Sequence, residues 1–475
     1  MSLRVGWKGG SPSREATITG ISIDTRSLEP GDLFVPLTDA RDGHEFVPQA
    51  FAQGAAAALV RAGYSRQPSD GVLIRVPDES GRDSVLAALE RIGMAARARL
   101  ADTARVIAVT GSAGKTGTKE MLRACLKACA SAPEKVHAPE KSFNNHWGVP
   151  LTLARMPADT EFAVFEIGMN HAGEIRPLTK MVRPHIAIVT NVLPVHVGNF
   201  PDGETGIANA KAEIFEGLES GGTAIILRDS PHYERLRAAA VGAGALERSF
   251  GDADSGADVV LRSVGVASEN PHDSQVVRAE FAGRGERVTF HLGMQGRHLG
   301  MNSLAVLLTL DTLHCNLGRS TRALAEVGAA AGRGARQNIR CGDGELLLLD
   351  ESYNANPASI AAALASLAAI NDTLIRRRIA VLGDMLELGE NAVQYHVGLK
   401  DSASRADLVF CCGPNMRHLY DALPPEKRGA HAENSEKLIP HVLDALRPGD
   451  AVMVKGSLGS RMALVVEALK NHFAN

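Results

Sequence analysis

Short apolar runs alternate along this chain with stretches in which apolar residues recur every three or four positions. The run Val106–Val109 is followed by a glycine turn, and from Lys115 to Leu126 the apolar residues have helical spacing. A short β-favouring run predicts a strand buried on both faces, and helical spacing predicts a helix that covers it. Repetition of this pair along the chain predicts a doubly wound parallel sheet.

The pattern divides the chain into three α/β units, which we place at residues 1–102, 103–318 and 319–475. Length alone also predicts about three domains, at ~150 residues to a domain. We expect strands at 21–23, 33–37, 106–109, 162–165, 185–190, 223–227, 345–350, 377–384, 406–413 and 450–457, further valine-rich strands over 250–292, and helices beginning near 46, 82, 115 and 297.

Residues 110–116 read TGSAGKT, directly after the first strand of the central unit. Backbone N–H groups of a glycine turn that opens a helix point at whatever the turn admits, and a phosphate fits there. Lys115 can reach β- and γ-phosphate oxygens, and the Thr116 hydroxyl can bind Mg²⁺. Val109 stands where the general phosphate-loop pattern has its first glycine, so this loop is a shortened form. An ordinary strand-to-helix turn is the alternative.

Composition narrows the classes of function. The net charge of −3 provides no basic field for nucleic acid. The sequence has neither a signal-peptide-like start nor a run of 18 apolar residues. Its six cysteines lack CxxC spacing, which favours reduced thiols in the cytosol. We therefore expect a cytoplasmic protein without membrane insertion or bound nucleic acid, and a monomer, because nothing in the sequence suggests an obligate assembly.

Polar side chains follow the central strands, at the edge where ligands gather in parallel sheets. Glu166 ends the strand at 162–165 and can present a carboxylate to Mg²⁺ held by Thr116, although an acidic residue at a strand end is usually only solvated. His196 follows the strand at 185–190, but single histidines are more often structural than functional.

Lys211 and two asparagines are further candidates in the central unit. Lys211 lies among alanines in a predicted helix, where an apolar setting lowers the pKa of a lysine and makes it reactive. A lysine that extends to solvent is the simpler alternative. Asn144 and Asn145 precede Gly148 in a loop, and spacing does not decide whether they are turn residues or substrate donors.

Strands of the third unit end in polar, glycine-containing loops, which favours a second nucleotide-facing edge. Tyr353 can stack on a ring, and Asn354 and Asn356 can hydrogen-bond one or form an Asx turn before a helix. The last predicted strand delivers Lys455 and Ser457 to a loop.

These stretches together resemble the Mur ligase family of peptidoglycan precursor enzymes. Motifs in the family's order cover nearly the whole chain: TGSAGKTGTKEM, SFNNHWGVPLTL, EIGMNHAGEI, NVLPVHVGNF, AKAEIFEGL, DESYNANP, VLGDMLELGE and VKGSLGSRM. DESYNANPAS and GDMLELGE are most similar to the branch that joins D-alanyl-D-alanine to UDP-N-acetylmuramoyl-tripeptide. The resemblance implies a small N-terminal α/β domain that binds the UDP substrate, a central P-loop ATPase-like domain, and a C-terminal Rossmann-like domain that closes over ATP and binds the dipeptide.

The family chemistry implies roles for the candidate residues. The peptide carboxylate attacks ATP to give an acyl phosphate, and the dipeptide amine then displaces phosphate. Thr116 and Glu166 match the family's ligands for a first Mg²⁺, while His196 and Lys211 match those for a second, with Lys211 carrying a carbamate. Lys115, Lys211 and His196 are the implied catalytic residues.

Binding residues follow from the same resemblance. ATP would be bound by Thr110, Gly111, Ser112, Ala113, Gly114, Lys115, Thr116, Asn302, Arg336, Tyr353, Asn354 and Asn356. The two other substrates would be bound by Asp24, Thr25, Arg26, His44, Asn144, Asn145, Lys455 and Ser457, of which the first four lie in predicted turns and face the uridine end.

Departures from the family pattern leave some positions without a role. HLGMN replaces the family's HN pair, so His298 has none while Asn302 retains its own, and the pair His146–Trp147 is unusual. Another ligase of this fold, either a different muramyl ligase or a folylpolyglutamate synthase, is the alternative activity. A P-loop protein that uses nucleotide as a switch is the rival from another class.

Overall fold

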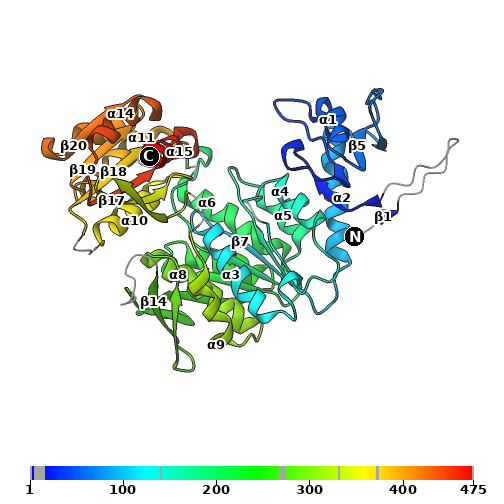
Figure 1. Ribbon diagram of the computed structural model, residues 1–475. Helices are drawn as coiled ribbons and strands as arrows, with labels where there is room; N and C mark the ends of the chain where they lie inside the picture. Colours follow the sequence, from blue (N-terminus) through cyan, green and yellow to red (C-terminus); the bar gives the residue numbers. More distant parts are fainter. Residues whose placement is uncertain are drawn as a thin grey trace.

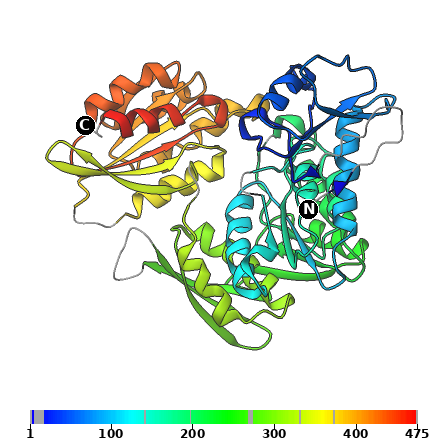
Figure 2. The same ribbon diagram turned by 45° about the vertical axis from the view of Figure 1, so that its right-hand side comes forward.

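The computed structural model describes residues 3–4, 17–139, 142–195, 197–266, 274–329, 332–370 and 374–472. The described residues form three α/β domains, which confirms the predicted fold class. In Figures 1 and 2 the N-terminal domain lies above the central domain at the right, and the C-terminal domain above it at the left. No helix in this part of the chain has the length and apolar character that crossing a bilayer requires.

The N-terminal domain is a small parallel sheet covered by helices. Its elements are β1 Leu3–Arg4, β2 Thr17–Ile18, β3 Gly20–Ser22, β4 Asp32–Phe34, α1 Val47–Ala52, β5 Ala57–Arg61, β6 Val72–Val76 and α2 Ser84–Ala98. The sheet order is β3-β4-β5-β6, and α2 packs both on this sheet and on helices of the central domain. Nε of Arg97 on α2 donates to the Val182 carbonyl oxygen at 2.8 Å, which fixes the helix to the central domain.

The central domain contains the phosphate loop. Its elements are β7 Arg105–Thr110, α3 Lys115–Cys129, β8 Val136–His137, α4 Gly148–Ala154, β9 Phe162–Glu166, α5 Ile175–Val182, β10 Ile186–Val189, η4 Val197–Asn199, α6 Gly203–Ala212, η5 Glu213–Gly217, β11 Thr223–Leu227, α7 Tyr233–Gly242, β12 Leu246–Asp252, β13 Val259–Val266, β14 Gln275–Phe281, β15 Glu286–Leu292, α8 Arg297–Thr312, α9 Leu317–Ser320 and η6 Thr321–Glu326.

The described central strands form one sheet in the order β15-β14-β13-β12-β11-β10-β7-β9-β8. Strands from β8 to β13 pair in parallel, and β13, β14 and β15 pair antiparallel. Strand β7, which leads into the phosphate loop, lies between β9 and β10. The chain continues from β7 toward β8 and β9 on one side of the sheet and returns to β10 on the other. The loops that follow β7, β9 and β10 therefore open into one crevice.

Two apolar layers cover this sheet. Side chains such as Ile107, Leu122 and Leu308 pack one face under α3 and α8, while Ala108, Phe165 and Ile207 pack the other face under α5, α6 and α7. The core under α3 also includes Leu324 of η6. Residues 319–327 therefore pack with the central domain, and the C-terminal domain begins after them rather than at the predicted residue 319.

The C-terminal domain is a second parallel sheet with one antiparallel edge strand. Its elements are β16 Ala335–Cys341, β17 Gly344–Glu351, α10 Pro357–Ala368, β18 Arg377–Gly383, η7 Gly389–Asn391, α11 Ala392–Val397, α12 Lys400–Ala403, β19 Leu408–Cys412, α13 Met416–Ala422, β20 Arg428–Ala432, α14 Ser435–Ala445, β21 Asp450–Lys455 and α15 Ala463–His472. The order is β16-β17-β21-β18-β19-β20, so the carboxyl ends of β17, β21 and β18 lie side by side.

Candidate active site

The phosphate loop between β7 and α3 is shaped by a close approach from α8. Gly114 has a φ of 82°, a backbone conformation that favours glycine. A Cβ atom at this position would lie 2.3 Å from Nδ2 of Asn302. The glycine therefore allows Asn302 to pack against the loop, where the resemblance to the Mur ligases places it.

Asn191 holds the loop from the neighbouring strand. Its Oδ1 accepts a hydrogen bond from the backbone N–H of Ala113 at 2.9 Å, and its carbonyl oxygen accepts one from Ser112 at 3.1 Å. Its Nδ2 donates to the Ala113 carbonyl oxygen at 3.1 Å. Asn191 is absent from the predicted site residues, although a position just after a central strand is the same signal that selects Glu166.

Lys115 is half-buried at the start of α3, and its Nζ donates to the Gly111 carbonyl oxygen at 2.7 Å. Loss of water around the side chain lowers the pKa of Lys115; the Glu166 carboxylate opposes this effect and Arg333 adds to it. An ammonium group that has lost water is stabilised by a nearby anion. The loop is therefore suited to a phosphate, which would supply negative charge next to Lys115 and the N–H groups.

Thr116, Glu166 and Asn144 form a buried oxygen-rich cluster beside the loop. The Thr116 hydroxyl donates to Oε2 of Glu166 at 2.8 Å, and Nδ2 of Asn144 donates to Oε1 at 2.7 Å. Within the described residues, no group of three or more His, Cys, Asp and Glu side chains could bind a metal. The hydroxyl and the carboxylate are nevertheless hard oxygen donors of the kind that Mg²⁺ accepts together with phosphate oxygens and water, so these residues fit that ion.

Asn145 has a different role from its neighbour. Its Oδ1 accepts hydrogen bonds from the backbone N–H groups of Trp147 at 3.2 Å and Gly148 at 2.9 Å, and its side chain thus forms the turn that precedes α4. The sequence left open whether these asparagines are turn residues or substrate donors, and the structure separates them. Asn144 lines the cavity described below, and Asn145 is a turn residue.

Lys211 is only 3% exposed on α6. Burial, and next the positive charge of Lys115, hold the pKa of Lys211 well below its usual range. Lys211 is not among the described residues that line the cavity at the phosphate loop. A lowered pKa increases the fraction of uncharged amine, which is the form that reacts with carbon dioxide. His196, the predicted partner of Lys211 in metal binding, lies outside the described residues.

A cavity of about 600 Å³ spans the central and C-terminal domains. Its walls come from the phosphate loop and α8 on one side and from the loops after β17, β18 and β21 on the other. The predicted site residues that line it are Ser112, Ala113, Gly114, Lys115, Thr116, Asn144, Glu166, Asn302, Tyr353, Asn354, Asn356, Lys455 and Ser457. Thr110 and Gly111 lie at the base of the loop.

Arg333, rather than the predicted Arg336, reaches this cavity from the C-terminal domain. Its guanidinium stacks 4.0 Å from the centre of the Tyr353 ring, and its Nη2 donates to the Ser142 hydroxyl at 3.3 Å across the domain boundary. Arg336 lies on β16 and is not among the described residues that line the cavity. The segment GRGAR offers two arginines, and only the path of the chain into β16 distinguishes them.

Lys455 and Ser457 join the loops of the C-terminal wall. Nζ of Lys455 donates to the Asn354 carbonyl oxygen at 2.9 Å and to the Glu351 carboxylate at 3.3 Å. The Ser457 hydroxyl donates to the Ala355 carbonyl oxygen at 3.3 Å and accepts from the backbone N–H of Leu386 at 3.0 Å. Both residues therefore fix the shape of the wall as well as lining it.

The predicted substrate residues of the N-terminal domain lie away from the cavity. Asp24 and Arg26 form a partly exposed ion pair of 2.6 Å beside Thr25, and their contact with a uridine stays a prediction. His44 is buried: Nδ1 lies 2.7 Å from Asp42, and Nε2 accepts from the backbone N–H of Arg61 at 3.2 Å. Both ring nitrogens of His44 are thus engaged within the fold, and its contact with the substrate stays a prediction.

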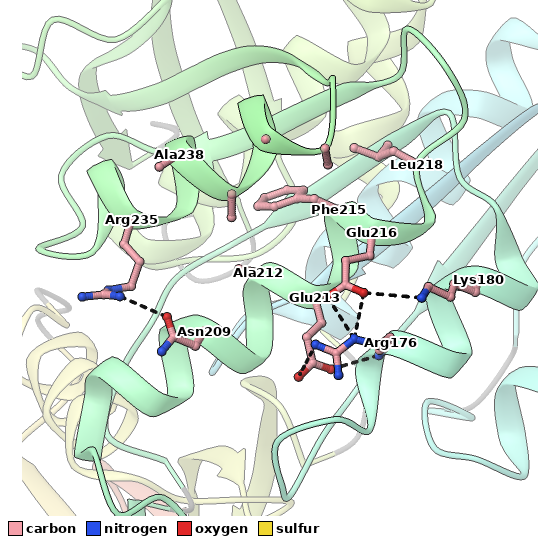
Figure 3. Close-up of a pocket in the computed structure, with 13 residues that line it drawn as sticks. Arg176, Lys180, Asn209, Ala212, Glu213, Phe215, Glu216, Leu218, Arg235 and Ala238 are labelled. Atoms are coloured by element: carbon pink, nitrogen blue, oxygen red, sulfur yellow. Dashed lines mark hydrogen bonds and ion pairs between the residues drawn. The ribbon is translucent and has the colours of Figure 1, made fainter.

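A second cavity, of about 920 Å³, lies between α5, α6, η5 and α7 (Figure 3). Arg176 pairs with Glu216 at 2.7 Å and with Glu213 at 3.7 Å, and Arg235 donates to Asn209 at 3.2 Å. Because these charged groups already have partners and much of the remaining lining is apolar, this cavity concentrates no reactive group. We therefore assign the functional site to the cavity at the phosphate loop.

Known proteins resemble both of the domains that form this cavity. The family model for the Mur ligase middle domain matches residues 109–310, and that for the Mur ligase glutamate ligase domain matches residues 335–458. The UDP-N-acetylmuramoyl-tripeptide--D-alanyl-D-alanine ligase of Bacillus subtilis is 31% identical over 97% of this chain and 95% of its own. The ligase of the same name from Escherichia coli is 34% identical over 96% of this chain and 95% of its own.

Solved structures show the same likeness. MurF from Acinetobacter baumannii has a TM-score of 0.80 and 28% identity, covering 97% of this chain and 94% of its own. The fold and the cavity thus define a three-domain P-loop protein whose phosphate loop faces a second α/β domain. This chain belongs to the Mur ligase family.

Proposed function

We propose that this protein is an ATP-dependent amide ligase that joins D-alanyl-D-alanine to UDP-N-acetylmuramoyl-tripeptide in peptidoglycan synthesis. One observation carries the proposal: a single cavity is lined both by a phosphate loop and by three loops of the C-terminal domain, so a nucleotide and a peptide can meet in it. The full-length relatives from Bacillus subtilis and Escherichia coli bear the name of this activity.

The reaction consists of two transfers. The tripeptide carboxylate attacks the γ-phosphorus of ATP, so that an acyl phosphate forms and ADP leaves. The amine of the dipeptide then attacks the acyl carbon, phosphate leaves, and an amide bond remains. Because a carboxylate and a polyphosphate repel each other, correct positioning and nearby positive charge are the main catalytic contributions of the protein.

The phosphate loop would bind the nucleotide phosphates. Backbone N–H groups of residues 114–116 would donate to them, because those of Ser112 and Ala113 already bond to Asn191. Lys115 would release its bond to Gly111 to reach the β- and γ-oxygens. Thr116 and Glu166 would hold a Mg²⁺ ion, which neutralises phosphate charge when bound. Their existing contact of 2.8 Å supports this assignment, because it brings the hydroxyl and the carboxylate to one point.

Lys211 would hold a second Mg²⁺ together with His196, after its amine has added carbon dioxide to form a carbamate. The carbamate converts a cationic side chain into an anionic oxygen ligand. The low exposure and lowered pKa of Lys211 support this role, since the uncharged amine is the nucleophile in the addition.

The C-terminal wall would complete the site. Arg333 and Tyr353, stacked on each other, would contact the nucleotide, while Asn302 approaches it from α8. Lys455 and Ser457 would shape the pocket for the incoming dipeptide through their bonds to the loops after β17 and β18. A site divided between two domains requires them to be together during the reaction.

The test is ADP release, measured with each substrate alone and with both together. We expect rapid ADP release only when UDP-muramoyl-tripeptide and D-alanyl-D-alanine are both present, with one amide product formed for each ADP. Tripeptides that end in diaminopimelate or in lysine, compared side by side, will identify the third residue. ADP release at the full rate without either peptide would overturn the proposal.

Two alternatives are outcomes of the same assay. Preference for glutamate and a folate would indicate a folylpolyglutamate synthase, and preference for another amino acid would indicate a different muramyl ligase. Slow turnover that muramyl peptides do not change would indicate a nucleotide switch.

The cytoplasmic location and the monomeric state stay predictions, which fractionation and light scattering can test.

A further inference from the structure

Two leucines lie exposed on the C-terminal wall of the active-site cavity. Among the described residues, the large apolar side chains that are well exposed and line this cavity are Tyr353, Leu386 and Leu458. Arg333 stacks on the Tyr353 ring, whereas Leu386 and Leu458 are 42% and 66% exposed. Single exposed leucines are common on protein surfaces, but two that open into one functional cavity favour an apolar ligand group.

The loops that carry the two leucines pack directly on each other. Leu386 follows β18 and Leu458 follows β21, and these strands are neighbours in the sheet. The backbone N–H of Leu386 donates to the Ser457 hydroxyl at 3.0 Å. A Cβ atom on Gly459 would lie 2.7 Å from Cδ1 of Leu386, so a glycine at this position leaves room for the leucine side chain. Leu386 therefore lies against the residue that follows Leu458.

Buried polar groups fix the loop after β18 from behind. Oδ1 of Asp384, a buried carboxylate, accepts a hydrogen bond from the backbone N–H of Met416 at 2.7 Å. Nε2 of His396, which is fully buried, accepts one from the backbone N–H of Met385 at 3.0 Å. These bonds hold the two residues that precede Leu386, so the fold itself sets the position of this leucine.

The same loop contacts the loops around the phosphate site. A Cβ atom on Gly198 of η4 would lie 3.0 Å from Cα of Gly389, three residues after Leu386. Helix η4 follows the loop after β10, in which the backbone N–H of Leu193 donates to the Ser112 hydroxyl of the phosphate loop at 2.9 Å. A series of contacts thus connects the leucines with the place where ATP would be cleaved.

We propose that Leu386 and Leu458 form an apolar subsite that binds a methyl side chain of the incoming dipeptide, and that they thereby select alanine over glycine. This inference rests on the proposed ligase function, in which loops of the C-terminal domain shape the dipeptide pocket. Two leucine side chains offer branched alkyl groups and no polar atom, which suits a methyl group. A nucleotide base needs hydrogen-bonding groups at its edge, and the stacked pair of Arg333 and Tyr353 is the better surface for its ring.

The test compares D-alanyl-D-alanine with glycyl-D-alanine and D-alanyl-glycine in the ligation assay of the full-length protein. Burial of one methyl group favours binding about fourfold, so the wild-type kcat/KM for D-alanyl-D-alanine should exceed that for at least one glycine-containing dipeptide by about this factor or more. In Leu386→Ala and in Leu458→Ala the KM for D-alanyl-D-alanine should rise about fourfold, while the KM for ATP stays within about twofold. In the double variant the preference for the methyl group should fall below about twofold.

Leu374→Ala is the matched control. It makes the same substitution at a leucine of the C-terminal domain that is 76% exposed and is not among the described residues that line the cavity. Its dipeptide KM and its preference for the methyl group should equal those of the wild type. The preference is a ratio measured within one variant, so it does not depend on the fraction of protein that is folded.

The outcomes separate this subsite from the proposed function. A wild type that ligates all three dipeptides equally well, or a double variant that keeps the wild-type preference, would overturn the subsite and leave the ligase function intact. A larger rise in the KM for ATP than in the KM for the dipeptide would assign the leucines to the nucleotide and would also overturn it. Failure of the wild type to form any amide with D-alanyl-D-alanine would instead refute the proposed function, and the subsite with it.

Discussion

At the scale of single residues, two arginines three positions apart provide a matched pair. Arg333 stacks on Tyr353 and reaches Ser142, whereas Arg336 lies on β16 away from the cavity lining. We expect Arg333→Ala to raise the KM for ATP at least about fivefold, since a stacked, hydrogen-bonded guanidinium contributes about 1–3 kcal/mol. Arg336→Ala should leave KM within about twofold. Steady-state kinetics of the two variants show which arginine binds ATP. A larger rise in the KM for ATP in Arg336→Ala than in Arg333→Ala would restore the assignment made from sequence.

Lys211 connects stability with function at the same scale. Its folded-state pKa lies below its unfolded value, so the unfolded chain binds the proton more strongly and stability decreases as pH falls from about 10 toward the folded pKa. Lys211→Met should therefore abolish ligation yet raise the free energy of unfolding at pH 7 by about 1 kcal/mol, with a smaller gain at pH 9. Urea unfolding in bicarbonate-free buffer measures this. A variant less stable than wild type at pH 7 would contradict it.

The carbamate on Lys211 has its own test. Lys211→Ala leaves space where an added short carboxylic acid can supply the missing oxygen ligand, so acetate or propionate should restore part of the activity. Lys115→Ala, assayed in the same buffers, should gain nothing. Full activity of the wild type after removal of all bicarbonate would refute the carbamate.

At the scale of elements, Asn356 has two roles that can be separated. It caps α10: its Oδ1 accepts from the Ser359 N–H at 2.8 Å, and the Ser359 hydroxyl accepts from the Asn356 N–H at 2.9 Å. It also lines the cavity. Asn356→Ala should cost about 1 kcal/mol of stability, while Asn356→Asp keeps the cap and loses only the amide donor. Thermal unfolding and the KM for ATP, compared for both variants, assign each role; equal stability of all three proteins would exclude the cap.

Many strands with strong apolar runs were predicted as elements, but β5 and β6 of the N-terminal domain and the edge strands β16 and β20 are among those that were not. The predicted strand at 223–227 agrees with β11, and the predicted helix at Lys115 agrees with α3. Strands β16 and β20 have the sequences ARQNIRC and RGAHA, in which polar residues and glycine interrupt the apolar pattern that predicts a strand. An edge strand pairs on one side only, so it needs fewer apolar residues than the central strands do.

At the scale of the whole molecule, two glycines form a contact between domains. A Cβ on Gly198 of η4 would lie 3.0 Å from both Cα and N of Gly389, the first residue of η7. Gly198→Leu should separate the two domains and raise the KM for ATP several-fold. Gly283→Leu, at a site where an added Cβ meets no atom within 4 Å, is the control. Small-angle scattering should show a larger radius for the first variant alone, and unchanged kinetics for Gly198→Leu would exclude this contact from closure.

The sequence by itself determined the fold class and the residues whose place follows from local pattern. Apolar periodicity identified the sheets, and TGSAGKT identified the phosphate loop, because strand, turn and helix are each set by neighbours along the chain. Only the tertiary structure decided that Arg333 reaches the cavity, that Asn191 braces the loop, and that His44 is internal. These depend on which distant strands become neighbours, and sheet order is not encoded in any single stretch. The phosphate loop and the loops of the C-terminal domain can each be recognised from their own stretch of sequence. That they line one cavity follows only from the folded structure.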